Sequence, residues 1–129
     1  MDKFSNCDQT ISRSNFSDKT GISRRTLRKD EALAIVLVPD YRKVLDIMQK
    51  ELALPRNKCP LTPYHQWVLS KIRQESMAQG WGNSPGGRAF LKAWIKSNRA
   101  NLSFSAYQQN QSAKSSKKQQ ITELEGETL

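Results

Sequence analysis

The positions of glycine and proline constrain the fold of this chain more than any other feature of its sequence. They stand at Gly21, Pro39, Pro55, Pro63 and Gly80, where each residue ends one segment or opens the next. Between them, apolar residues recur mainly at helical spacing. The sequence therefore predicts a mainly α-helical protein built from short helices.

The first part of the chain is expected to hold three of these helices. One spans about 14–20 and stops at Gly21, and the next begins after Ser23, a good N-cap. Residues 32–38 extend this second helix or form a short buried strand, since periodicity does not decide for so short a run. A third helix is expected from Asp40, as its N-cap, to Pro55, with one apolar face made of Tyr41, Val44, Leu45, Met48 and Leu52.

Two more helices are predicted after a proline-rich connector. Thr62 and Pro63 fit the N-cap and first position of a helix whose buried side holds Tyr64, Trp67, Val68 and Ile72. A glycine-rich loop around Trp81 follows. The last helix starts at Pro85 or Arg88 and runs to Arg99, with an apolar arc of Phe90, Leu91, Trp94, Ile95 and Leu102 beside a basic arc of Arg88, Lys92, Lys96 and Arg99.

Composition sets the expected organisation of the whole chain. Only 36% of the residues are hydrophobic, and the chain from Ser103 onward is rich in Ser, Gln, Asn and Lys. Such a composition buries too little surface to offset chain entropy. We therefore expect a flexible N-terminus (1–12), a helix-turn-helix region with a following helix (13–54), a second helical region (55–102) and a disordered tail (103–129).

The charge of the chain points to a polyanionic partner. The formal net charge is +9, and the pI is about 9.8. Between Ser76 and Thr122 there is no acidic residue but there are seven basic ones, and Glu123, Glu125 and Glu127 then turn the chain acidic. No apolar run is long enough for a membrane helix or a secretory signal. We expect a cytoplasmic protein, nucleoid-associated if prokaryotic.

The sequence offers little for catalysis, metals or cofactors. Cys7 and Cys59 lack zinc-ligand spacing, and His65 has no nearby Cys, Asp or Glu. The glycine-rich loop lacks the Lys-Ser/Thr ending of a nucleotide-binding loop. Trp67 and Trp94 fall in helical apolar patterns, which favours core packing. We expect two free thiols, no metal, no cofactor and no enzymatic activity.

The most informative stretch runs from Phe16 to Glu31 and fits a helix-turn-helix. Gly21 can adopt the left-handed conformation that turns the chain after the first helix. Ile22 and Leu27 can pack under the turn against Phe16, and Ser23 can cap the second helix. That helix then presents cations near its N-terminal end, the end that meets base edges in the major groove: Arg24, Arg25 and Arg28.

The segment from Lys19 to Arg28, followed by Glu31, resembles the DNA-binding segment of MerR-type regulators and excisionase-like proteins, in which a TGVSxxTLRxxE pattern joins the two helices. The resemblance covers about residues 13–32. It implies that Gly21, Ile22 and Leu27 hold the motif together and that these residues face DNA: Ser23, Arg24, Arg25, Thr26 and Arg28. We include the neighbouring Arg13, Lys19 and Lys29 among the candidate DNA contacts.

The chain also departs from that family pattern. Lys29-Asp30 replace its aromatic pair, and neither the GYRxY wing nor an effector-binding region is visible. These departures predict a reduced variant without small-molecule sensing. The alternative to a DNA-binding helix-turn-helix is an ordinary basic helical hairpin over 14–31, with no role in DNA binding.

The sequence therefore predicts a double-stranded DNA-binding transcriptional regulator, most simply a repressor. Arg88, Lys92, Lys96 and Arg99 would contact phosphates, or else form a solvated helix face. The resemblance implies a homodimer, through the helix of Tyr41, Val44, Leu45 and Met48 or that of Phe90, Leu91 and Trp94. The alternatives are an accessory adaptor of a mobile element, with a protein partner on the C-terminal helices, and a basic RNA-binding protein.

Overall fold

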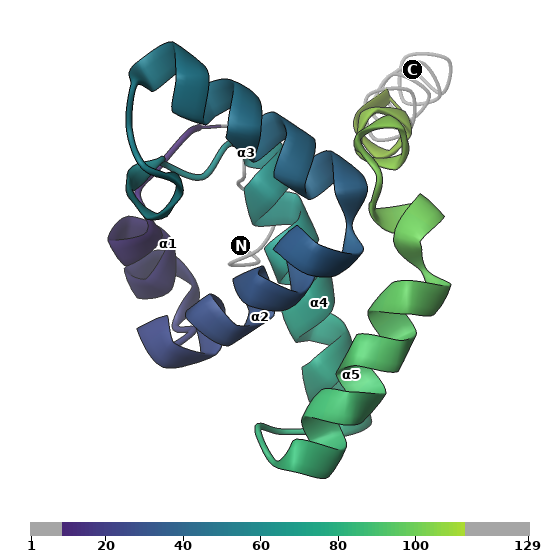
Figure 1. Cartoon of the computed structure of the whole chain (residues 1–129). Coiled ribbons are helices and arrows are strands. Elements are labelled where there is room, and N and C mark those ends of the chain that lie inside the picture. The colour runs from purple at the N-terminus through teal and green to yellow at the C-terminus, as the bar shows by residue number, and fades with distance from the viewer. Residues whose placement is uncertain (1–8, 113–129) are drawn as a thin grey trace, which may run out of the picture.

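The computed structural model describes residues 9–112, and these residues form an all-α structure (Figure 1). The helices are α1 (Arg13–Thr20), α2 (Arg24–Leu37), α3 (Pro39–Leu52), α4 (Pro63–Gln79) and α5 (Pro85–Ser97), with short 3-10 turns at Arg56–Lys58 and Arg99–Leu102. Residues 104–112 form a further helix. Within the described residues no strand is present. One isolated antiparallel bridge joins Ile11 to Leu61.

Local signals in the sequence explain where the helices begin and end. The side chains of Ser12, Ser23, Thr62 and Ser84 each accept a hydrogen bond from a backbone N–H in the first turn of the helix that follows. Gly21 and Gly80 end α1 and α4 in the left-handed conformation, with φ of 77° and 68°. The predicted caps at Ser23 and Thr62 are thus confirmed.

Helix α4 runs through the middle of the molecule, and α2, α3 and α5 pack against it (Figure 1). Its predicted buried side, Tyr64, Trp67, Val68 and Ile72, is buried as expected. One apolar cluster contains these residues together with Phe16 from α1, Leu27 from α2, and Leu91 and Ile95 from α5. The two predicted regions, 13–54 and 55–102, therefore share a single core.

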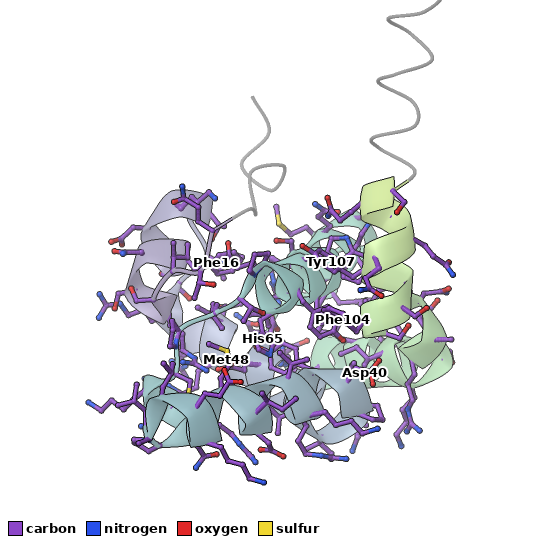
Figure 2. All side chains as sticks on the ribbon, turned by 90° about the horizontal axis from the view of Figure 1, so that it is seen from above. Phe16, Asp40, Met48, His65, Phe104 and Tyr107 are labelled. Atoms are coloured by element: carbon purple, nitrogen blue, oxygen red, sulfur yellow. The ribbon has the colours of Figure 1, made fainter. Side chains whose placement is uncertain are left out.

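The prediction that the chain is disordered from Ser103 onward is wrong for residues 104–112. Ser103 Oγ accepts a hydrogen bond from Ala106 N, and Asp40 accepts one from Phe104 N at 2.9 Å (Figure 2). The rings of Phe104 and Tyr107 lie 5.3 and 5.8 Å from that of Tyr64. Two aromatic residues spaced three apart give this short helix an apolar side that the average composition concealed. The remainder of the expected tail, 113–129, lies outside the described residues.

Several other expectations change. Residues 32–37 are helical, so the strand alternative is wrong. Helix α3 begins at Pro39 rather than after Asp40, because proline fixes a helical φ at the first position. Within the expected flexible N-terminus, Ile11 pairs with Leu61, and residues 1–8 lie outside the described part. None of the described helices is both long and apolar enough to cross a membrane.

Candidate nucleic-acid interface

Helices α1 and α2 are joined by the sharp turn that the sequence predicted. The Gly21 backbone N–H donates to Ser17 O, and Ser17 Oγ donates to the carbonyl of Ile22 across the turn. Thr20 Oγ1 donates to Phe16 O at 2.8 Å. Phe16, Ile22 and Leu27 are buried beneath the turn, as predicted. The helix pair is thus held by its own short-range bonds and by the common core.

The N-terminal end of α2 presents its cations to solvent. Arg24, Arg25 and Arg28 are exposed, Lys29 is half-buried, and Ser23 and Lys19 are exposed beside them. No described residue forms an ion pair with any of the three arginines. The expectation that this end of α2 is an outward-facing arginine cluster is confirmed.

Both acidic residues of α2 are buried and neutralised by arginines from other helices. Asp30 is 1% exposed. It accepts two hydrogen bonds of 3.0 Å from Arg73 of α4 and one of 2.7 Å from Arg88 of α5. The Arg73 contact is bidentate, the strongest geometry for such a pair. Because Asp30 is buried and paired with two arginines, it does not reduce the positive charge at the surface of α2.

Glu31 is held in the same way by Arg13, one of the predicted DNA contacts. Arg13 donates to both carboxylate oxygens at 2.7 and 2.8 Å, and Tyr41 Oη donates to Glu31 at 2.6 Å. Arg13 also donates to backbone carbonyls of the Arg56–Cys59 segment. Burial disfavours the charged form of Arg13. The hydrogen bond to Glu31 and the negative charge of Glu31 outweigh this effect, so the pKa of Arg13 is raised. Arg13 is therefore partly buried and engaged by Glu31 within the protein.

Thr26 and Arg88 are likewise engaged inside the protein. Thr26 is buried, and its Oγ1 accepts hydrogen bonds from Ser23 Oγ at 3.0 Å and from Asn83 Nδ2 at 3.1 Å. Arg88 holds Asp30. Asn83 ties the glycine-rich loop to the start of α2, a role that its sequence position did not indicate. Arg73 was missed because nothing near it in sequence marks it as the partner of Asp30.

The remaining basic residues of α5 lie along one edge of that helix. Arg88 faces α2 through its bond to Asp30. Lys92 and Lys96 follow at intervals of four, so they continue on the same edge, one and two turns further on. Both are exposed, as is Arg99 just beyond the helix. The geometry thus places a row of exposed cations along α5, beyond the point where Arg88 joins that helix to α2.

A groove of about 460 Å³ runs between α1 and α2. Arg24 and Arg28 line it from α2, together with Leu27. Arg13 and Glu31, already paired with each other, also line it, and Ser14 and Asn57 complete the lining. Arg25 is absent from this lining. The arginine cluster is therefore divided between the groove and the rest of the α2 surface.

The residues considered for catalysis or metal binding lie in packed, hydrogen-bonded surroundings. His65 is buried: Thr62 N donates to its Nδ1 at 3.3 Å, and its Nε2 lies 3.2 Å from Tyr41 O. Burial lowers the His65 pKa from 6.5 to about 4, despite the favourable bond to Tyr41 O. Cys59 is a buried free thiol, and Cys7 lies outside the described residues. In residues 9–112, no three His, Cys, Asp or Glu side chains gather in a way that would hold a metal.

The tryptophans differ from one another. Trp67 is buried and Trp94 is half-buried, consistent with core packing. Trp81 stacks on Phe90, whose ring centroid is 6.2 Å away. Phe90 itself is 63% exposed, which corrects the prediction that it belongs to the buried arc of α5.

The two helix faces suggested for dimerisation supply most of their side chains to the core. Tyr41, Leu45 and Leu91 are fully buried. Val44, Met48 and Trp94 pack partly against the same cluster. Phe90 is the member of these two faces that stands out into solvent.

Comparisons with protein families, with curated proteins and with solved structures give no match. The surface features of this chain that bear on its function are the exposed arginines of α2, the cations of α5 and the groove between α1 and α2.

Proposed function

We propose that this protein binds double-stranded DNA through α1 and α2 and acts as a transcriptional regulator, most simply as a repressor. The start of α2 enters the major groove, where arginine can donate two hydrogen bonds to guanine. One observation carries the proposal. Arg24, Arg25 and Arg28 stand exposed at one helix end, while both acidic residues of the same helix are buried against other arginines.

This arrangement opposes what helix stability alone would favour. The N-terminal end of a helix carries partial positive charge, so acidic residues stabilise its first turn and cations destabilise it. The first turn of α2 contains no acidic residue and two arginines. A polyanion would remove this repulsion. Backbone N–H groups and cations at one helix end also suit phosphate binding.

The cations of α5 extend the proposed surface. Lys92, Lys96 and Arg99 would contact phosphates, which add affinity without reading sequence. Two copies of the protein would bind half-sites one helical turn apart, roughly 34–36 Å. No effector is required in this mechanism, since occupying a promoter is sufficient for repression.

The test is selection of duplex DNA from a random pool at near-physiological salt, followed by binding of the enriched duplexes by three proteins. Relative to the wild type, Arg25→Ala should cost about 1–3 kcal/mol of binding free energy on the preferred site and relax its base preference. Lys92→Ala should weaken all duplexes alike. A palindromic enriched motif would support the dimer, which sedimentation of the complex would measure directly.

Three results would redirect the proposal. A pool without any enriched motif, bound equally by wild type and Arg25→Ala, would mean that net charge alone drives binding. Preference for structured RNA over duplex DNA in direct competition would favour the RNA-binding alternative. Weak DNA binding that becomes tight only with a recombinase or transposase would favour the adaptor alternative.

A further inference from the structure

We infer that the groove between α1 and α2 is a phosphate-binding site, in which Arg24 and Arg28 clamp one strand of the DNA backbone while Arg25 reads bases. The inference rests on the proposed function and deepens it, because it divides three neighbouring arginines into two roles. The sequence alone assigned all three to base edges.

The three arginine side chains lie on two different sides of α2. Arg24 and Arg28 are four residues apart, so they share one side of the helix, one turn above the other. Both line the groove toward α1. Arg25 is one position further round the helix and does not line it. One position is a rotation of about 100°, so a single docking cannot present Arg24 and Arg25 to the same atoms.

The floor of the groove carries a neutralised pair of charges. Arg13 and Glu31 line it, but each neutralises the other through two hydrogen bonds of 2.7 and 2.8 Å. Glu31 also accepts from Tyr41, and Arg13 also donates to Asn57 O at 3.3 Å. The floor is thus fixed and close to neutral. It offers no unpaired carboxylate to repel an anion or to bind the two arginines.

The wall of the groove that α2 supplies carries two cations. Arg24 and Arg28 are exposed, and within residues 9–112 neither has an acidic partner. Like charges at this spacing destabilise a helix by a few tenths of a kcal/mol. An anion between them would turn this repulsion into attraction. The planar guanidinium fork matches the oxygens of a phosphate, and the groove, at about 460 Å³, has room for one.

The experiment measures duplex binding across a range of salt concentrations for wild type, Arg24→Ala, Arg28→Ala and Arg25→Ala, on the selected duplex and on a base-substituted one. Arg24→Ala and Arg28→Ala should each lower affinity for both duplexes by the same factor, roughly tenfold. Each should also reduce the slope of log K against log salt by about 0.9. Arg25→Ala should instead change the ratio between the two duplexes.

Two controls make the result specific to the groove. Lys43→Ala removes an exposed cation from α3, on another element, and should leave the affinity within about twofold of wild type. Arg28→Lys keeps the charge but loses the planar fork, so it should keep the salt slope while binding more weakly than wild type. Thermal unfolding of each variant confirms that the fold is retained.

The failure of this inference differs from failure of the proposed function. If wild type binds no duplex at near-physiological salt, the proposed function falls and the groove assignment falls with it. If wild type binds but Arg24→Ala or Arg28→Ala changes the ratio between the two duplexes, or leaves affinity and salt slope unchanged, the groove assignment alone is wrong.

Discussion

Asp30 is the residue at which three helices are joined. It lies on α2 and accepts hydrogen bonds from Arg73 on α4 and Arg88 on α5. Its partners are 43 and 58 residues away in sequence. The buried carboxylate therefore sets the position of α5, and with it the row of cations on that helix, relative to the start of α2.

We predict that Asp30→Asn lowers the free energy of unfolding by about 3–5 kcal/mol, because two largely buried arginines lose their counter-charge. Urea denaturation at pH 7 measures this. The matched control is Asp46→Asn, which breaks the exposed pair with Arg56 and should cost less than about 1 kcal/mol. Equal losses from the two substitutions would show that Asp30 does not hold the helices together.

His65 makes stability depend on pH. Its pKa is about 4 in the folded protein and 6.5 ordinarily, so between these values the unfolded chain binds more protons than the folded one. The contribution of neutral His65 to the free energy of unfolding should therefore be fully present above about pH 6.5. It should fall as the pH drops toward 4, by up to about 1.4 kcal/mol per pH unit.

The measurement is the free energy of unfolding from urea titrations between pH 7.5 and 4.5, for wild type and His65→Gln. The variant loses ring contacts with Tyr41 and is expected to be less stable at pH 7.5. It should nevertheless show a smaller slope with pH, because glutamine does not titrate. An identical slope in both proteins would assign the pH dependence to other groups.

At the scale of elements, the glycine-rich loop fixes how α5 leaves α4. Gly87 packs so closely on the loop that an added Cβ would overlap the backbone carbonyl of Trp81. Gly86, one position earlier, faces open space. The loop is further tied to α2 through Asn83 and Thr26. Loop, α5 and the start of α2 therefore form one connected unit.

We predict opposite effects for alanine at these two glycines. Gly87→Ala should cost at least about 1–3 kcal/mol, because the backbone of the loop must move. Gly86→Ala should be neutral or stabilising by up to about 1 kcal/mol, since alanine favours the helix more than glycine does. Thermal unfolding of the pair gives the comparison. A stable Gly87→Ala protein would mean that the loop shifts without strain.

At the scale of the whole molecule, the α1–α2 pair is not an independent module. Phe16 and Leu27 belong to the same apolar cluster as Leu91 and Ile95. The ion pairs of Asp30 cross from α2 to α4 and α5. Losing either half of the chain would therefore expose the apolar surface and the charged partners of the other.

We accordingly predict a single unfolding transition for the whole chain. Differential scanning calorimetry should give a calorimetric enthalpy equal to the van't Hoff enthalpy. Circular dichroism of the helices and fluorescence of the tryptophans should report the same midpoint. Two separated transitions would show that residues 13–54 and 55–102 fold as distinct units.

The sequence by itself determined the local features of this protein. Caps and turns depend on a few adjacent residues, so Ser23, Thr62, Gly21 and Gly80 mark helix ends without knowledge of the fold. The apolar spacing of α4 and the outward arginines of α2 follow from helical periodicity in the same way.

Only the tertiary structure decided which charged residues remain available at the surface. Arg13 and Arg88 resemble Arg24 and Arg25 in sequence, but acids 18 and 58 residues away bind them. Residues 104–112 are helical because Tyr64 and Trp67 offer aromatic surface to Tyr107. These outcomes depend on contacts between distant segments, and such contacts exist only after the helices have packed around α4.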